Sequence, residues 1–495
     1  MLRTTQWNPV AWILGSAAGE MNLWFVPSSL NGGPDMKTST VSRIGIVGLS
    51  LLVVFVGLSV GITGSATAQS PEFVDMDASD LDGSGTAGDP YEITDASELQ
   101  AMEDDLDAHY ELANNIDASA TAQWNGQAGF DPIGDGSGDF TGKFDGNQHT
   151  ITGLTIDRGS SDEQVGLFGE VDSALIESVH LESVTISGRD SVGALAGHLE
   201  ADVTIRSASM NGAVSGTTET GGLIGSNTDS TVKRASATGT VTGSDSIGGL
   251  VGQNFGGVVT QASSQAAVTA TGKEQGGKFA RGGGLVGGNF NEGIINKSYA
   301  TGSVTGGKAG GITGENFNGS RVANTYAAGN VDGRSSQLTG GVSGDNIGGC
   351  PFVNEQQCVN FEASTITNSY WDTEATGQST SAGDTVGLTT AEMTSAAAET
   401  NMSELDFDSV WETQPDDYPV LTQQTEDKDS TTTVPPELEG DVTGEQYFAV
   451  LDGADTLSAS SLSAAVNGWS QSGSVNGVDI GAFELSALVN YWANN

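Results

Sequence analysis

The stretch TGGLIG at residues 220–225 decides the fold, because close variants of it return along most of the chain. The same glycine-flanked apolar cluster reads VGLFG at 165–169, VGALAG at 192–197, IGGLVG at 247–252, GGGLVGG at 282–288, GGITG at 310–314 and GGVSG at 340–344. Its central residues are Leu167, Leu195, Leu223, Leu250, Leu285, Ile312 and Val342. Their successive separations are 28, 28, 27, 35, 27 and 30 residues. A near-constant period of about 20–50 residues is typical of a solenoid.

Each period also contains further short β-like pieces. A second apolar position follows every cluster and is occupied by Ile176, Ile205, Val232, Val259, Ile295, Val322 and Ile366. A third recurs as Val214, Val241, Val268, Val304 and Val331. β-Branched residues favour strands, and glycine at this density disfavours helices. Three short strands per period predict an all-β fold, a three-faced parallel β-helix with the central residues of the clusters in one interior column.

The paired glycines beside each central residue have a structural interpretation. We expect them to turn the chain with positive φ and to let neighbouring coils approach without Cβ clashes. A phosphate-binding loop is the alternative, but the chain has no G-x-x-x-x-G-K-[ST] run and no G-x-G-x-x-G run in a βαβ context. The glycine pattern therefore favours a structural role for these residues over a role in nucleotide binding.

The charge balance limits the partners. The chain has 17 basic and 63 acidic residues, a formal net charge of −46. Phosphate binding needs clustered Lys and Arg, so we expect no nucleic-acid partner and no attraction to an anionic bilayer. Acid spread along a whole chain is typical of adaptation to high salt, where screening weakens self-repulsion. This acidic composition indicates a high-salt habitat and does not indicate what the protein does.

The beginning of the chain predicts export. Residues 1–35 lack the period, and we expect them to precede the natural start at Met36. Residues 36–68 are typical of a signal peptide, with two basic residues, an apolar run over 44–62 and an A-x-A cleavage site at 66–68. A signal anchor is the alternative, since the run is about long enough to span a bilayer. Cleavage would leave a mature chain without a membrane span.

The other predicted segment boundaries are placed where the amino-acid composition changes. The acidic lead-in at 69–89 is interpreted as a linker, because the full calcium-loop pattern is not met. The remaining predicted segments are an N-terminal cap with the first coils at 90–157, a repeat β-helix at 158–372, a C-terminal cap at 373–425, a linker at 426–440 and a helical module at 441–495. In the N-terminal cap we expect a helix whose N-terminus is capped by Asp95 or Ser97. In the C-terminal cap we expect the apolar end of the last coil to be covered by Trp411, Tyr418, Val420 and Leu421.

Two kinds of covalent modification are suggested by the sequence. Cys350 and Cys358 are the only cysteines, and a close pair in an exported chain predicts a disulfide. A metal site is the alternative, but it needs two further ligands nearby, and all four histidines are distant in sequence. Asn296, Asn318 and Asn401 each begin an N-x-[ST] triplet and are candidate N-glycosylation sites.

No catalytic arrangement is legible in the sequence. The acidic residues of the repeats do not recur at one repeat position, and the histidines lie in unrelated contexts. We therefore name no catalytic or metal-ligating residue and expect no cofactor, with calcium as the alternative. A carbohydrate-active β-helix enzyme, a polysaccharide lyase or hydrolase, stays open as the alternative, as does its substrate-binding component. Such sites need only a carboxylate pair, or calcium with a basic residue, on one coil face.

The clusters, together with NKSYATGSVTG at 296–306 and ANTYAAGNVDG at 323–333, resemble GLUG-motif repeats. The flanking runs GTAGDPYEI at 85–93, GKFDGNQHTITGL at 142–154 and NSYWDTEATGQ at 368–378 are similar to those around such repeats. The resemblance covers about 85–421 and implies a right-handed β-helix in an exported or surface protein. Adhesin-like proteins and the N-terminal regions of immunoglobulin-A-cleaving metallopeptidases contain these repeats. The H-E-x-x-H motif of that peptidase is absent here.

The tail contains a short duplication. LSAAVNGW at 462–469 recurs as LSALVNYW at 485–492, with an offset of 23. This arrangement resembles a degenerate dockerin, a module whose loops bind calcium and whose helices bind a partner. Gly468, Ser470 and Ser472 stand where calcium ligands should be, and only Asp479 matches. A plain helical hairpin or interaction tail is the alternative.

Together these features predict a secreted or cell-surface structural protein, adhesin-like, that mediates adhesion or envelope and matrix interactions. The expected partners are an extracellular glycan or a surface protein, and a docking partner for 441–495. Ligand contacts are expected where the period breaks, at 273–283 and 348–361, and in the tail, because functional loops are displayed on rigid scaffolds. For 348–361, a disulfide that only stabilises the loop is the alternative.

Overall fold

The structure is a computed structural model that describes residues 76–135, 138–159, 163–272, 280–334, 338–347 and 362–422. It also gives the backbone of two short hairpins, β1 (Ser16–Ala17) with β2 (Glu20–Met21) and β41 (Ser474–Val475) with β42 (Val478–Asp479). The predicted signal peptide, both cysteines and the rest of the 441–495 module lie outside the described residues.

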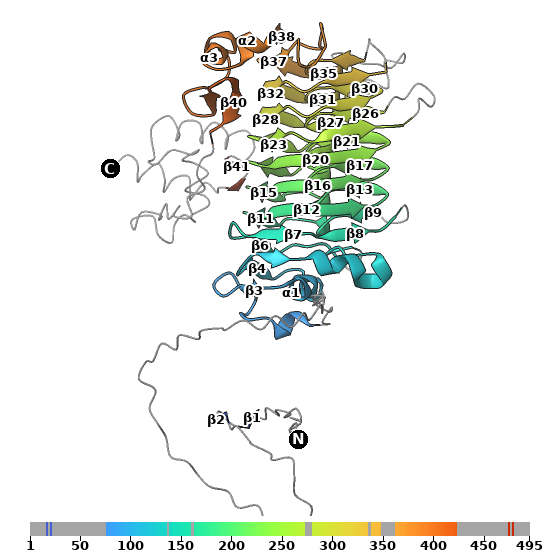
Figure 1. Ribbon diagram of the computed structural model, residues 1–495, viewed down its shortest axis with the longest axis vertical. Coiled ribbons are helices and arrows are strands. Elements are labelled where there is room, and N and C mark those ends of the chain that lie inside the picture. Colours follow the sequence, from blue (N-terminus) through green and yellow to red (C-terminus); the bar gives the residue numbers. More distant parts are fainter. Residues whose placement is uncertain are drawn as a thin grey trace, which may run out of the picture. The chain divides into compact units, whose positions relative to one another are not determined.

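Two seven-stranded parallel sheets run along the repeats (Figure 1). The first, called sheet 1, contains β10 (Phe168–Val171), β14 (Ala196–Leu199), β18 (Ile224–Thr228), β22 (Val251–Phe255), β27 (Val286–Phe290), β31 (Thr313–Phe317) and β35 (Ser343–Asn346). The second, sheet 2, contains β9 (Glu163–Val165), β13 (Asp190–Val192), β17 (Thr218–Gly221), β21 (Asp245–Gly248), β26 (Arg281–Gly283), β30 (Lys308–Gly310) and β34 (Thr339–Gly340). Every glycine-flanked cluster lies where the chain passes from sheet 2 to sheet 1.

Sheet 3 forms the remaining face and receives two strands from most coils. One series is β11 (Leu175–Glu177), β15 (Thr204–Arg206), β19 (Thr231–Lys233), β23 (Val258–Thr260), β28 (Ile294–Ala300), β32 (Arg321–Ala327) and β36 (Thr365–Thr367). The other is β12 (His180–Ser187), β16 (Ser209–Ser215), β20 (Ser236–Gly243), β24 (Ser263–Ser264) with β25 (Ala267–Ala270), β29 (Val304–Gly306) and β33 (Val331–Gly333). Residues with positive φ, such as Ser207 and Arg234, separate the two series. The predicted three-faced parallel β-helix is confirmed, with one face bent.

The interior is built of stacked apolar columns. The central residues of all seven clusters, from Leu167 to Val342, have no exposed surface. Ile176, Ile205 and Val232 are register partners on successive coils, and the column continues to Ile366. Because each coil repeats the same spacing, like side chains meet their equivalents at the inter-strand distance, and the core extends with every coil.

The cluster glycines act by close approach and not by positive φ. None of them is among the residues with positive φ, which are other glycines and polar residues, most often Ser and Asn. A Cβ on Gly225 would lie 2.4 Å from the backbone carbon of Ser191, and one on Gly197 would lie 2.3 Å from that of Gln164. Sheets 1 and 2 therefore meet backbone to backbone at this corner. The expectation of φ > 0 at these glycines is wrong, because polar residues at other positions of each coil adopt the αL conformation instead.

A column of asparagines, four buried and the last half-buried, joins five consecutive coils inside the corner after sheet 1. Asn227 Nδ2 donates to Asn254 Oδ1 at 2.7 Å, and the same contact repeats from Asn254 to Asn289, from Asn289 to Asn316 and from Asn316 to Asn346. Each side-chain amide also donates to a backbone carbonyl of its own turn, such as Ser230 O for Asn227. Within the described part of the chain, every side-chain amide along the stack has a hydrogen-bond partner, and so does every side-chain oxygen except Oδ1 of Asn227 at the first position.

The N-terminal segment extends sheet 3 and closes its first edge. β3 (Tyr91–Ile93), β4 (His109–Leu112), β5 (Ile116–Asp117), β6 (Lys143–Asp145), β7 (Thr150–Thr152) and β8 (Thr155–Asp157) all pair in parallel. The helix α1 (Ala96–Gln100) is capped at its N-terminus by Asp95, whose carboxylate accepts from the amides of Ser97 and Glu98. Short 3-10 helices at Ala101–Asp104 and Ser119–Gln127 complete this end.

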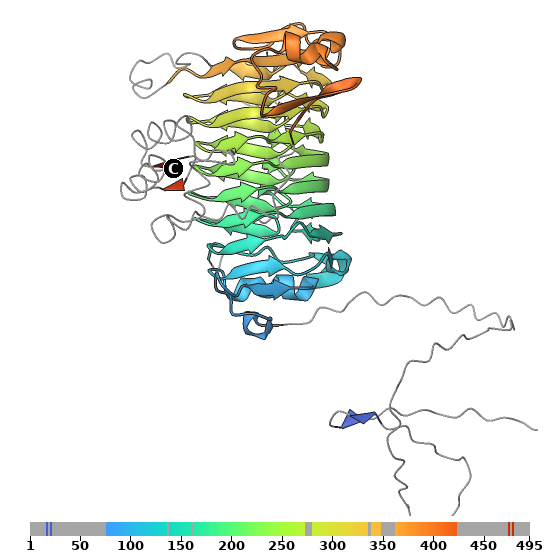
Figure 2. The same cartoon turned by 90° about the vertical axis from the view of Figure 1, so that its left-hand side faces the viewer.

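The C-terminal segment packs partly on the side of the solenoid. It contains β37 (Ser369–Asp372), β38 (Thr385–Leu388), α2 (Thr390–Met393), α3 (Ala397–Asn401), β39 (Trp411–Gln414) and β40 (Asp417–Leu421). The ring of Trp411 lies 6.0 Å from that of Tyr299 and 5.5 Å from that of Tyr326. The hairpin β39–β40 therefore lies beside β28 and β32 (Figure 2). The expectation that Trp411 covers the end of the last coil is wrong, because a tyrosine column on sheet 3 offers an aromatic surface.

Among the described residues, no helix is both long and apolar enough to cross a membrane.

Candidate functional site

The outer face of sheet 1 presents one register position of every coil as a straight column. Its members, in order along the solenoid, are Glu170, His198, Ser226, Gln253, Gly288, Glu315 and Asp345. Every member except Gly288 has a polar side chain, because alternate residues of each strand point away from the core. The column changes in character from one end to the other, with a histidine between acids near the N-terminus and an ion-pair network near the C-terminus.

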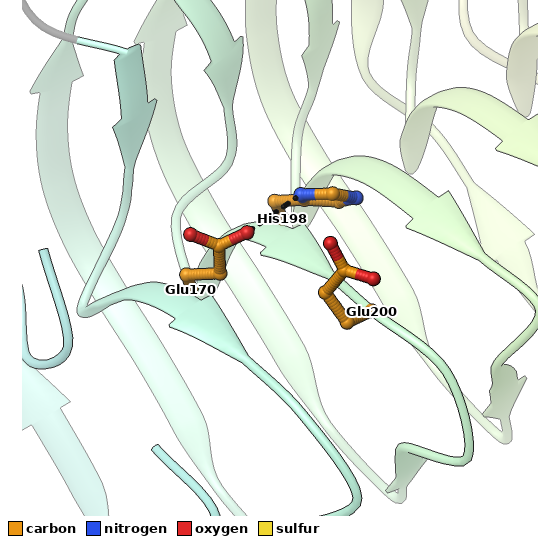
Figure 3. Close-up of side chains that lie close together, drawn as sticks. All are labelled: Glu170, His198 and Glu200. Carbon is orange, nitrogen blue, oxygen red and sulfur yellow. Dashed lines mark ion pairs between the residues drawn. The ribbon is translucent and has the colours of Figure 1, made fainter. Parts of the chain in front are cut away.

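A three-residue cluster of Glu170, His198 and Glu200 lies at the N-terminal end of this column (Figure 3). Glu170 comes from β10, His198 from β14 on the next coil, and Glu200 directly follows β14. His198 Nδ1 lies 3.3 Å from Glu170 Oε1, and one ligand atom from each side chain lies within 4.8 Å of the other two. All three side chains are half-buried. This is the group of described residues that could hold a metal ion.

The hydroxyl group of Thr228, outside the cluster, contacts the ring nitrogen of His198 that faces away from Glu170. His198 Nε2 lies 3.1 Å from Oγ1 of Thr228, which belongs to β18 on the following coil. The two ring nitrogens therefore face different partners, Glu170 on one side and Thr228 on the other. Because all these groups stand on paired strands, the ring has a defined orientation.

The C-terminal end of the column is an ion-pair network. Arg281 Nη2 contacts Asp245 Oδ2 at 2.5 Å, and Arg281 Nη1 lies 3.6 Å from Glu315 Oε2. Lys308 pairs with Glu315 and, at 2.9 Å, with Asp345. Burial alone would raise the pKa of Asp245, but Arg281 outweighs it and holds that pKa below its ordinary value. Burial likewise opposes the charge of Lys308, yet Glu315 and Asp345 raise its pKa. The network joins sheets 1 and 2 and is structural in character.

An aromatic column lies two residues further along the same strands. Phe255 pairs in register with Phe290, which pairs with Phe317. Phe255 is 38% exposed, whereas Phe290 is 9% exposed and has the Arg281 guanidinium 5.2 Å from its ring centre. The rings of Phe290 and Phe317 are 6.4 Å apart. Sheet 1 thus shows an aromatic column beside a polar one.

The sequence-predicted residues fall in different places. The central cluster residues line the core, away from solvent. Asn296 is half-buried in β28 beside a fully buried Ser298, and Asn318 is half-buried with its amide donating to Asn291. Asn401 and Ser403 are both exposed at the end of α3. The Asn401 amide donates to Glu392 O and Ala397 O, so exposure alone distinguishes this site from the other two, and glycosylation stays a prediction. The cysteines and the period breaks at 273–279 and 348–361 lie outside the described residues.

Sequence reasoning did not single out Glu170, His198 or Glu200. The available signal was spacing: Glu170 and His198 are separated by 28 residues, which equals the step between Leu167 and Leu195. Equal steps place residues in register on neighbouring coils, so distance along the sequence hides proximity in space. The asparagine column carried the same signal, because each of its members follows a cluster glycine by two residues.

Two family models match this chain. The model described as the M26 IgA1-specific metallo-endopeptidase N-terminal region matches residues 93–212, and the model described as the GLUG motif matches residues 216–242. The chain therefore contains GLUG-motif sequence, and in the structure its repeats are stacked as the parallel coils of a β-solenoid.

Among individual proteins, the chain is similar to halomucin of Haloquadratum walsbyi, with 42% identity over 153 residues, 29% of this chain and 2% of halomucin. It is also 34% identical over 122 residues to a protein named as a Gly-rich membrane protein in Evansella cellulosilytica, covering 23% of this chain and 14% of that one. The chain thus spans a small part of these relatives. A crystal structure described as an immunoglobulin A1 protease from Bacteroides ovatus aligns with 69% of this chain and 94% of its own, at 19% identity and a TM-score of 0.43.

Proposed function

We propose that this chain is an exported adhesive protein that binds an extracellular glycan or a surface protein through the side of its β-helix. The observation that carries the proposal is the register of sheet 1, which repeats one outward position on seven stacked strands. A rigid row of equivalent positions suits multivalent recognition, because each additional contact forms without a new ordering cost.

The relatives support a location at the cell surface. Halomucin and a Gly-rich membrane protein are similar to parts of this chain, and the matched repeat covers 216–242. The net charge of −46 keeps such a surface solvated and disfavours nucleic acid as a partner.

Within sheet 1, we assign the partner contact to the aromatic column that begins at Phe255. A ring that is 38% exposed on a rigid strand offers a flat apolar contact, and polar side chains such as Gln253 lie beside it. Binding sites commonly combine aromatic surfaces with a few oriented polar groups. A neutral glycan fits this combination, because sugar rings have apolar faces and hydroxyl edges.

The test uses the mature full-length chain and measures binding to isolated cell envelopes and to a glycan array at high salt. We expect saturable binding that weakens at least ~5-fold in Phe255→Ala, the effect of a contact worth about 1 kcal/mol. Val386→Ala is the matched control, because Val386 is 47% exposed and lies on β38, away from sheet 1. Equal losses in both variants would count against the aromatic column.

A screen for glycan degradation with the same protein separates adhesion from catalysis. Turnover that disappears on substitution of one Asp or Glu on a coil face would overturn the adhesive proposal. Binding without turnover supports it.

We propose that attachment of the protein to the cell surface depends on residues 441–495. Deletion of 441–495 is expected to release the protein from the cell surface into the medium while glycan binding by the solenoid persists. Retention of the truncated chain at the surface would assign attachment to another part.

A further inference from the structure

We propose that Glu170, His198 and Glu200 form a site for one divalent transition-metal ion, with Zn²⁺ as the ion that fits the ligand set. The inference does not depend on the adhesive function. It starts from the distance of 3.3 Å between His198 Nδ1 and Glu170 Oε1. Two ligands of a tetrahedral zinc ion, each bonded at about 2.0–2.1 Å, are separated by roughly this distance.

The third ligand needs only a side-chain adjustment. Glu200 stands two residues after His198 on the same outward face, and all three ligand atoms lie within 4.8 Å of one another. Both carboxylates point toward the imidazole in Figure 3. Because all three side chains are half-buried, the glutamates can rotate while the strands stay fixed, and water has access to the remaining coordination position.

Thr228 orients the imidazole for this role. When Nε2 donates its proton to Thr228 Oγ1, at 3.1 Å, Nδ1 presents a lone pair to Glu170. A metal ion bound between Nδ1 and Glu170 requires this tautomer, and Thr228 Oγ1 is placed to accept its proton. Metal-bound histidines usually donate their other N–H to an oxygen in this way. Thr228 is therefore a positioning residue.

The ligand types select among ions. One imidazole and two carboxylates suit zinc and its neighbours in the transition series. Calcium takes six to eight oxygen ligands, and magnesium keeps most of its water, so neither gains from a histidine. The ion would join β10 to β14 through their side chains and leave a coordination position open on the outer face of sheet 1.

The experiment titrates Zn²⁺ into chelator-stripped full-length protein by calorimetry at high salt, which suppresses diffuse binding to the many carboxylates. We expect one saturable site that millimolar Ca²⁺ does not displace. His198→Ala and Glu170→Gln are expected to weaken Zn²⁺ binding by ~10-fold or more, and Thr228→Val by about 10-fold. A rise in the thermal unfolding midpoint with Zn²⁺, absent in His198→Ala, is a second readout.

His149→Ala is the matched control, because His149 is hydrogen-bonded to Asn115 and lies outside the proposed metal site. Its Zn²⁺ affinity should equal that of the unaltered protein. Circular dichroism in chelator establishes that each variant is folded, and Glu200→Gln replaces any variant that is not. The absence of a saturable Zn²⁺ site, or equal affinity in His198→Ala and His149→Ala, would overturn the proposal.

Discussion

The side-chain amide of Asn254 donates to Oδ1 of Asn289 on the next coil at 2.8 Å, and neither side chain is exposed. This contact is one step of a column that continues in both directions. Buried amides are costly without partners and stabilising when every donor and acceptor is used. The column therefore fixes which coil lies against which.

Asn254→Ala is expected to destabilise the solenoid. The substitution leaves Oδ1 of Asn289 without its donor, and a buried acceptor in that state costs about 1–3 kcal/mol. The thermal unfolding midpoint at constant salt measures the loss. Asn211→Ala, at an exposed position of β16, is the control and should change stability by less than about 0.5 kcal/mol. Similar midpoints for the two variants would contradict the role of the column.

Asn227, the first member of the asparagine column, has a hydrogen-bond acceptor that no donor in the described ranges uses. Asn227 Oδ1 is buried and has no hydrogen-bond partner among the described residues, and its register partner on the preceding coil is Leu199. Leu199→Asn would place an amide donor beside that oxygen. We therefore expect Leu199→Asn to cost clearly less stability than Leu195→Asn, which puts the same amide in an apolar column. Equal costs in thermal unfolding would show that the column cannot be extended.

Gly225→Ala is expected to disrupt the contact between sheets 1 and 2. The added Cβ would lie 2.4 Å from backbone atoms of Ser191 and Val192, and backbone cannot move aside as a flexible side chain can. We expect a loss of about 3 kcal/mol or more, or failure to fold. Gly88→Ala is the control, because no atom lies within 4 Å of its added Cβ. Retained stability in Gly225→Ala would contradict backbone contact at this corner.

The Asp245–Arg281 pair is expected to make stability depend on acidity. Because the folded-state pKa of Asp245 lies below its ordinary value of about 3.9, the pair stabilises the fold above that pH. The contribution is lost as pH falls through the folded-state pKa. Asp245→Asn should lower stability at neutral pH by about 1–2 kcal/mol, a modest amount because both side chains are part-exposed.

Unfolding midpoints of the two proteins measured from neutral to strongly acidic pH check this expectation. The difference between them should be greatest near neutrality and should vanish at the acidic end, where the native carboxyl is also neutral. Glu315, which also faces Arg281, is unchanged in both proteins. A difference that is independent of pH would assign the effect of Asp245→Asn to packing instead of charge.

The sequence alone determined the architecture. The step of about 28 residues between Leu167, Leu195 and Leu223 could be satisfied only by stacking equivalent coils, because each short apolar piece needs a neighbour to cover it. Asp95 was likewise a candidate helix cap from its residue type and its place ahead of an amphipathic run, and its carboxylate does accept from the first-turn amides. Such features depend on the chemistry of neighbouring residues and on the spacing of the repeats, and both can be determined directly from the sequence.

Only the tertiary structure decided which side chains meet. The period places Glu170 and His198 in register, but Glu200 and Thr228 join them through the direction of strands and the choice of rotamers. The same holds for Trp411, whose position against Tyr299 and Tyr326 depends on a chain reversal that no repeat specifies. Sequence periodicity sets the register between coils, whereas contacts made across a face depend on where each side chain points in space.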